Sequence, residues 1–266
     1  MTLLDAIILG ALQGAAEFLP ISSSAHLVIG QALLHVNEAN IYLEVALHFG
    51  TLLSVVVFFF KDIVGLFRSF FRFLGGQRDV DTRSGFMLSM YIIIGTIPAA
   101  VAGLLFESWF EARFNSAEFS GFMLLITAAA LLSTYFVKKY EHRLSFGRAI
   151  VIGIAQMLAI LPGISRSGST ITAGLFLGIE PGLAARFSFL LSLPAVAGAA
   201  LLKGLELAKH PLGGAELTIF GFGALISFAV GLVAIYLLLR IVVGRRFYMF
   251  GFYCLLVGIL TILFIR

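Results

Sequence analysis

A polar cluster interrupts the apolar sequence at LPGISRSGST, residues 161–170. Arg166 stands between Ser165 and Ser167, with Thr170 close behind. An arginine guanidinium carries a permanent charge and a planar fork of N–H donors, which match the oxygens of a phosphate or a carboxylate. The segment also begins a predicted helix, and the free backbone N–H groups there favour an anion. These features together predict a cradle for a phosphate group.

A second polar cluster lies in QGAAEFLPISSSAH, residues 13–26. Gln13 and Glu17 are four residues apart, so they share one face of a helix. A carboxylate in an apolar segment is a functional candidate by default, as a base, a metal ligand or the partner of a base. His26 adds an imidazole suited to proton transfer or to attack on phosphorus. Ser23 offers the preferred hydroxyl for chemistry or substrate binding.

Each candidate also has a structural interpretation. Arg166 could extend its charge to the membrane interface, or pair with Glu17 only as a counter-ion. His26 could be a satisfied core histidine, and at least one serine of the cluster could simply cap the following helix. His48 has no comparable polar neighbours in sequence, so we expect it to be structural. For Arg166, Glu17 and His26 we prefer the functional interpretation, because their polar clusters occupy two similar breaks.

The composition indicates a membrane protein. Of the 266 residues, 60% are hydrophobic and 12% are charged, and the mean hydropathy is +1.05. A soluble domain would carry about 25% charged residues. The net charge of +4 does not indicate nucleic-acid binding, because the basic residues cluster in short segments between apolar runs. The single cysteine, Cys254, excludes a disulfide framework and a thiolate metal site.

The apolar runs predict six membrane spans and two re-entrant hairpins. A span needs about 20 residues. The apolar regions 3–36 and 149–179 are each broken by a proline and a serine cluster, and their halves are too short to cross alone. Irregular backbone at this depth must be buried in protein or line a wet cavity, which favours re-entrant hairpins. The predicted spans are 41–60, 85–106, 119–137, 187–202, 217–239 and 247–265, the fourth extending back through Ala184.

The charged segments orient these spans. Loop 107–118 carries three glutamates against one arginine, whereas three other connections are basic and are therefore predicted to be cytoplasmic. Alternation through the spans then places hairpin 1–38 on the outer side and hairpin 149–180 on the inner side. The basic connections are 61–84, 138–148 and 240–246.

The two halves of the chain resemble each other. The matches keep the same order in both halves, which makes chance a poor explanation. Each half, 1–140 and 141–266, then holds one hairpin and three spans, and an odd number of spans inverts the second copy. The sequence thus predicts an all-α, single membrane domain over 1–266 with an inverted-topology repeat. The matching segments are AIILGALQ (6–13) with AIVIGIAQ (149–156), ISSSA (21–25) with ISRSG (164–168), and HFGTLLS (48–54) with RFSFLLS (186–192).

Interrupted helices in matching positions of two inverted halves point to a binding site. The tips of the two hairpins come from opposite faces, so we expect them to meet near the middle of the membrane. The predicted site combines Glu17, Ser22, Ser23, Ser24 and His26 with Ser165, Arg166, Ser167 and Thr170.

The two polar clusters resemble the signatures of a known family. QGAAEFLPISSSAH looks like the (E/Q)xxxE-containing signature of the undecaprenyl-diphosphate phosphatase family, also called the bacitracin-resistance protein family, and PGISRSGST matches its PGxSRSxxT signature. EVALHFGTLL (44–53) and FSFLLSLP (187–194) extend the resemblance. It implies a hydrolase of the bacterial inner membrane that removes the terminal phosphate of undecaprenyl diphosphate. The product is the monophosphate lipid carrier for peptidoglycan synthesis, and the activity confers bacitracin resistance.

The resemblance also implies roles for residues. It assigns catalysis to Glu17, Ser23, His26 and Arg166, and it implies Mg²⁺ or Ca²⁺ held by Glu17 and Gln13. Gln13 stands where the family's first glutamate often lies, which removes one charge from a two-carboxylate metal scheme. The family role suggests a site that opens to the periplasmic face, and the oligomeric state stays open, a homodimer included. The predicted diphosphate-binding residues are Ser22, Ser165, Arg166, Ser167 and Thr170.

Three questions stay open at this point. The attacking group could be His26, Ser23 or an activated water. A secondary transporter or flippase for a lipid-linked or anionic substrate would use the same broken helices and the same cradle, but it would not need Glu17 and His26. A phosphatase of the phosphatidic-acid type is disfavoured, because SSAH is only faintly similar to its PSGH and its other signatures are missing.

Overall fold

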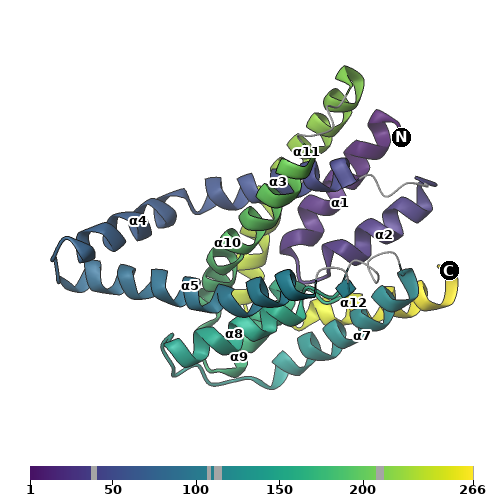
Figure 1. The fold of residues 1–266 in the computed structure, drawn as a ribbon. Helices are drawn as coiled ribbons and strands as arrows, with labels where there is room; N and C mark the ends of the chain where they lie inside the picture. Colours follow the sequence, from purple (N-terminus) through teal and green to yellow (C-terminus); the bar gives the residue numbers. More distant parts are fainter. Residues whose placement is uncertain (37–40, 107–108, 111–115, 208–212, 266) are drawn as a thin grey trace.

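The protein is all-helical in a computed structural model that describes residues 1–36, 41–106, 109–110, 116–207 and 213–265. Those ranges contain no named strand, which confirms the predicted all-α class. The elements are α1 (Leu3–Phe18), α2 (Ser23–Leu33), α3 (Ile41–Phe58), α4 (Phe60–Leu74), α5 (Val80–Leu105), α7 (Ala117–Ser133), η1 (Thr134–Phe136), α8 (Phe146–Leu158), α9 (Arg166–Phe176), α10 (Pro181–Leu207), α11 (Gly214–Val243) and α12 (Met249–Phe264) (Figure 1).

Several of these helices can cross a membrane. Among the described residues, α5, α7 with η1, α10 and α11 are each long and apolar enough, and α3 with α4 forms a further apolar pair bent by 71°. α12 is apolar but has only 16 residues. Large apolar side chains face outward, such as Leu104, which is 71% exposed, as expected of a surface in contact with lipid. The chain is therefore a polytopic membrane protein.

Both predicted helix–break–helix segments are present, and each breaks where the sequence predicts. α1 ends at Phe18, Pro20 lies in the turn, and α2 begins at Ser23. α8 ends at Leu158, and α9 begins at Arg166 after a turn that contains Pro162 and Gly163. Gly163 has a φ of +96°, a conformation that glycine adopts without steric cost. The fourth predicted span also extends back, as expected, since α10 begins at Pro181.

The prediction of a loop over 61–84 is wrong. Most of this stretch forms α4, and α5 begins as early as Val80. Apolar residues at helical spacing explain the difference, because Phe70 and Phe73 stack on Phe86 of α5 with ring centroids 5.6 and 4.0 Å apart. Arg68 and Arg72 stay exposed on α4. Figure 1 shows α4 and α5 side by side as an arm that extends from the remaining helices.

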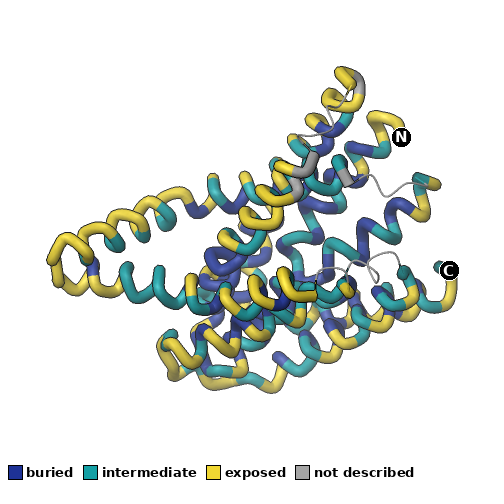
Figure 2. Tube along the Cα trace, in the orientation of Figure 1, coloured by how far each residue is buried: buried dark blue, intermediate teal, exposed yellow. Residues whose placement is uncertain are grey.

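The helices of the two halves pack across each other. α1 lies against α11 and α8 lies against α5, while α7 packs on α12. Glycines permit the close approach: a Cβ on Gly10 would collide with the carbonyl oxygen of Gly223, and a Cβ on Gly153 would collide with that of Gly95. Buried positions concentrate where the two hairpins meet (Figure 2). Most of the acidic loop predicted at 107–118 lies outside the described residues.

Candidate active site

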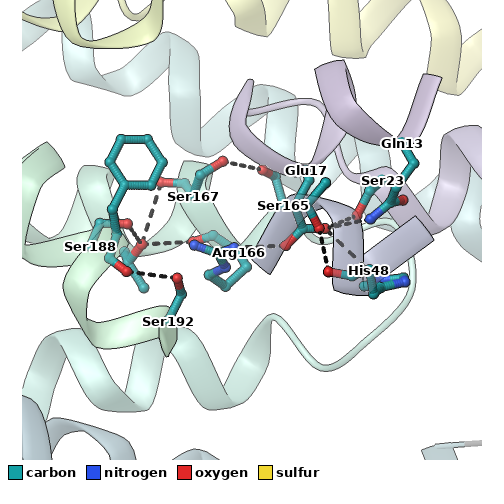
Figure 3. Close-up of polar contacts among 12 residues, drawn as sticks. Gln13, Glu17, Ser23, His48, Ser165, Arg166, Ser167, Ser188 and Ser192 are labelled. Carbon is teal, nitrogen blue, oxygen red and sulfur yellow. Dashed lines mark hydrogen bonds and ion pairs between the residues drawn. The ribbon is translucent and has the colours of Figure 1, made fainter. Parts of the chain in front are cut away.

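An ion pair joins the two hairpin tips at the centre of the protein. Arg166, the first residue of α9, donates from Nη2 to Glu17 Oε1 near the end of α1, at 2.7 Å. A second contact joins the same tips, from the backbone N–H of Gly163 to Ser24 Oγ at 3.4 Å. The predicted meeting of the polar clusters is therefore present in the structure, as Figure 3 shows for the ion pair.

The second oxygen of Glu17 collects two further donors. Ser23 Oγ donates to Glu17 Oε2 at 2.8 Å, and Gln13 Nε2 donates to the same atom at 3.1 Å (Figure 3). Only 10% of the Glu17 side chain is exposed, so these hydrogen-bond donors, rather than water, must stabilise the negative charge of the carboxylate. The contact with Gln13 confirms that both residues share one face of α1. The contact with Ser23 places a hydroxyl directly beside a potential base.

The guanidinium of Arg166 keeps one amino group free. Its Nη1 atom is buried and has no hydrogen-bond partner among the described residues. A buried, charged donor without an acceptor is costly unless a ligand supplies one. The adjoining cavity measures about 10 Å³, room for about one water. It runs between α3 and α10 and is lined by Glu17, Phe18, Thr51, Leu52, Val55, Arg166, Ser192 and Val196.

The hydroxyls around Arg166 hold the first turn of α9 in place. Ser165 Oγ caps the helix by accepting from the backbone N–H of Gly168 at 3.1 Å, and it lies 3.3 Å from Ser167 Oγ. Thr170 Oγ1 donates to the carbonyl of Arg166 at 2.8 Å and lies 2.6 Å from Ser188 Oγ of α10. These contacts fix the backbone that carries the arginine (Figure 3).

His26 lies beside the cluster but is directed elsewhere. Its Nδ1 is 2.9 Å from the carbonyl oxygen of Ser22, and its Nε2 is 2.8 Å from the hydroxyl of Tyr253 on α12. The two rings also stack, with centroids 5.6 Å apart. Both ring nitrogens are thus engaged away from Glu17.

The expected serine cap of α2 is wrong for its N-cap residue, Ser22, because that side chain makes no capping bond and instead lies 3.2 Å from Ser24 Oγ.

Sequence reasoning missed Tyr253, and it expected His48 to be structural rather than to lie near the ion pair. His48 Nε2 lies 3.9 Å from Glu17 Oε2, while its Nδ1 lies 2.9 Å from the carbonyl of Glu44 (Figure 3). The signal that could have found His48 is the repeat match of HFGTLLS, which begins with this residue and aligns with a segment of α10 that carries Ser188 and Ser192. Tyr253, which contacts His26, gave no comparable signal.

The fold and the site together define a polytopic membrane protein with a buried carboxylate–guanidinium pair where its two broken helices meet. Residues 6–260 match the family described as Bacitracin resistance protein BacA. The chain belongs to this family, because the match covers nearly its whole length.

Curated relatives resemble the chain over nearly their full lengths. A protein of Geobacter metallireducens is 44% identical over 100% of this chain and 99% of its own. A protein of Desulforapulum autotrophicum is 42% identical over 99% of this chain and 98% of its own. One of Korarchaeum cryptofilum is 41% identical over 97% and 98%, respectively. All three are named undecaprenyl-diphosphatase.

Proposed function

We propose that this chain hydrolyses undecaprenyl diphosphate to undecaprenyl phosphate and inorganic phosphate, which recycles the lipid carrier for peptidoglycan synthesis. The names of the relatives support this activity over a transporter or flippase. The observation that carries the proposal at the site is Arg166, with one amino group on Glu17 and a second one buried and free. The free Nη1 is the donor that a terminal phosphate oxygen would engage.

The arrangement of Ser23 and Glu17 favours a serine nucleophile. Ser23 Oγ attacks the terminal phosphorus, its proton passes to Glu17, and the bond from phosphorus to the bridging oxygen breaks as Glu17 returns the proton to the departing lipid phosphate. Water then attacks the phosphoserine. Glu17 takes the proton of this water and returns it to Ser23 Oγ as inorganic phosphate leaves. His26 is less suited to attack, because both of its nitrogens already have partners.

In this mechanism His26 positions the second helix. Its contacts to the Ser22 carbonyl and to Tyr253 tie the start of α2 to α12, which fixes Ser23 relative to Glu17. Arg166 stabilises the charge that develops on the phosphoryl oxygens, the main requirement of phosphoryl transfer. Ser165, Ser167 and Thr170 act indirectly in this mechanism, because their hydroxyls are hydrogen-bonded within the first turn of α9 and hold the backbone that carries Arg166. The role of Ser22 in diphosphate binding stays a prediction.

Two residues could supply oxygen ligands to a divalent cation, provided that the Gln13 amide turns over, because its nitrogen now faces the Glu17 carboxylate. Gln13 directs its amide nitrogen to the carboxylate, so its Oε1 is left buried without a partner among the described residues. Mg²⁺ is commonly held by one or two carboxylates together with substrate phosphates, and Ca²⁺ also takes oxygen ligands. We propose that Glu17 and Gln13 Oε1 hold the cation, which would neutralise part of the diphosphate charge. No set of three or more His, Cys, Asp or Glu in the described chain forms a metal site by itself.

The cavity also suggests where the lipid lies. Leu52, Val55 and Val196 form its apolar wall between α3 and α10, so the prenyl tail would leave toward the bilayer along these side chains. Because the cavity has room for about one water, diphosphate entry requires these walls to separate.

We place the protein in the bacterial inner membrane, with the site open to the periplasmic face. A homodimer and a division at residue 140 stay predictions.

We further propose the inverted repeat of one hairpin and three spans per half. The crossed packing supports it, since α1 lies on α11 in the same way as its repeat counterpart α8 lies on α5. Each contact uses a matching glycine, Gly10 in the first half and Gly153 in the second. The short α12 is the element that fits a full span least well.

One assay separates hydrolysis from transport. The purified protein in detergent micelles, where no membrane gradient exists, is given undecaprenyl diphosphate with Mg²⁺ or Ca²⁺, and released phosphate is measured. We expect multiple turnovers by the wild type. A folded protein that binds this lipid but releases no phosphate with either cation would contradict the hydrolase and favour a carrier.

A further inference from the structure

A second cavity, of about 260 Å³, lies at one end of the helix bundle. It is formed by η1 and the segment that follows it, together with the end of α9 and the turn between α11 and α12. It shares no lining residue with the cavity at Glu17 and Arg166. The lining residues are Thr134, Tyr135, Val137, Lys138, Tyr140, Leu175, Pro181, Val242, Arg245, Phe247 and Tyr248.

The charged side chains of this cavity are cationic. Lys138 and Arg245 line it together, and no acidic residue of the described chain does. Neither cation forms a salt bridge with a described residue. The guanidinium carbon of Arg245 lies 5.1 Å from the ring centroid of Tyr140, which is a weak cation–π contact that leaves its N–H donors available. Two cations without counter-ions in one concave site attract an anion.

The backbone holds this cavity in shape. The segment after η1 is tied to the turn between α9 and α10, because the N–H of His142 donates to the carbonyl of Gly178 at 3.0 Å. Within the segment, the Tyr140 hydroxyl donates to the carbonyl of Val137 at 3.1 Å. Arg245 has a φ of +55° and donates its N–H to the carbonyl of Val242 at 3.0 Å. Both cations are therefore presented by a constrained backbone.

The surroundings place the cavity at the level of lipid headgroups. Tyr135 and Tyr248 line it with ring centroids 5.1 Å apart, and tyrosine is enriched where a membrane meets water. Next to them, Phe136 and Met249 are 77% and 54% exposed on the outer surface, as apolar residues in contact with acyl chains are. A ligand whose anion enters the cavity could keep an apolar tail against these side chains.

We propose that this cavity binds a phosphate group carried by an anionic membrane lipid. Basic pockets at the cytoplasmic ends of membrane helices recognise phosphate headgroups in this way. Helix α9 links this cavity to the candidate active site. Arg166 is its first residue, and Leu175, about 14 Å further along the helix axis, lines the cavity. The inference does not depend on the proposed hydrolysis.

Paired variants test the site. Lys138→Ala/Arg245→Ala removes two charges from the cavity, and Lys139→Ala/Arg246→Ala removes two from neighbouring positions that do not line it. Binding of phosphatidic acid in phosphatidylcholine nanodiscs is measured by native mass spectrometry, with inorganic phosphate as a competitor. We expect the affinity for phosphatidic acid to fall about thirtyfold in the first variant and less than about threefold in the second. Phosphate release from undecaprenyl diphosphate in neutral detergent should be unchanged in both.

The outcomes separate the explanations. Equal losses in both variants would overturn the cavity and leave only a general attraction between basic loops and anionic lipid. Unchanged affinity in the first variant would also overturn it. A third outcome is that inorganic phosphate binds the wild type but not the Lys138→Ala/Arg245→Ala variant, and that phosphatidic acid does not displace the bound phosphate. The phosphate site would then stand, but its assignment to a lipid would be overturned. A thermal melt of each variant checks that the fold is intact.

Discussion

The guanidinium of Arg166 lies 2.7 Å from the carboxylate of Glu17, and this contact joins two hairpins across 149 positions of sequence. The same two groups are the ones that a diphosphate would use, one as a donor and the other as a base. The ion pair therefore joins the two groups on which the proposed chemistry depends. In the proposed mechanism the terminal phosphate would engage the free Nη1 of Arg166, while Nη2 of Arg166 and Ser23 Oγ stay in contact with the Glu17 carboxylate.

Arg166→Lys should lower kcat/KM by about 10²–10³-fold, because lysine keeps the charge but loses the planar fork that engages two oxygens. Phosphate release under subsaturating substrate measures this. Lysine is preferred to alanine, since removing the cation would leave Glu17 buried and unpaired, at a cost of about 3–5 kcal/mol in stability.

Arg186→Lys is the matched control for this experiment. Arg186 forms an ion pair with Asp62 between α10 and α4, outside the cavity at Glu17, and its side chain is 53% exposed. Its replacement should leave kcat/KM within about twofold. A similar loss in both variants would indicate a general effect of weakened ion pairs rather than a phosphate contact by Arg166.

Ser23→Ala should lower kcat by about 10³-fold or more if this hydroxyl attacks phosphorus. The neighbouring Ser24→Ala, which removes the contact to Gly163 but no contact to Glu17, should lower it by about tenfold or less. Rapid acid quench followed by peptide mass spectrometry should detect phosphate on Ser23 during turnover of the wild type. Near-normal turnover by Ser23→Ala would assign the attack to water.

Gln13→Glu tests the proposed cation ligands. A second carboxylate beside Glu17 should lower the Mg²⁺ concentration for half-maximal activity by about tenfold, because hard cations favour charged oxygen ligands. Activity after chelation with EDTA and readdition of Mg²⁺ measures this concentration. Activity that is the same with and without EDTA in both proteins would rule out the cation.

Gly153→Ala should destabilise the packing of α8 on α5 by about 1–3 kcal/mol, since the added Cβ would collide with the backbone of Gly95. Gly147→Ala, on the same helix, has open space around its new Cβ and serves as the control. Thermal unfolding in detergent compares them. If Gly153→Ala melts with the wild type, the close approach of the two helices is not present in the protein.

Tyr253→Phe removes the hydroxyl that contacts His26 Nε2 and keeps the stacked ring. We expect a modest fall in kcat of about three- to tenfold, with KM little changed, because His26 positions α2 rather than touching substrate. Steady-state kinetics with undecaprenyl diphosphate give both values. A loss as large as that of Ser23→Ala would instead place His26 in the chemical step.

The sequence allowed prediction of the features that are local. Proline and serine breaks marked both hairpins, the four-residue spacing placed Gln13 beside Glu17, and the order of the repeats indicated that the tips meet. Local signals failed at α4, because basic residues suggested a loop while its phenylalanines, at helical spacing, pack on α5.

The rest of the site depends on tertiary packing. His48 and Tyr253 reach the cluster from α3 and α12, helices that carry no serine cluster, and only the folded chain brings them beside Glu17 and His26. The orientation of the His26 ring could not be predicted from the sequence either. Its position in the motif suggested chemistry, whereas the rotation of α2 turns its ring toward α12.

The most direct test of the central claim is metal-dependent phosphate release from undecaprenyl diphosphate by the wild type and by Glu17→Gln. The substitution keeps the shape of the side chain and removes the base that contacts both Ser23 and Arg166. We predict that the folded variant still binds the lipid but turns over at least about 10³-fold more slowly. Wild-type turnover by a folded Glu17→Gln protein would contradict the account.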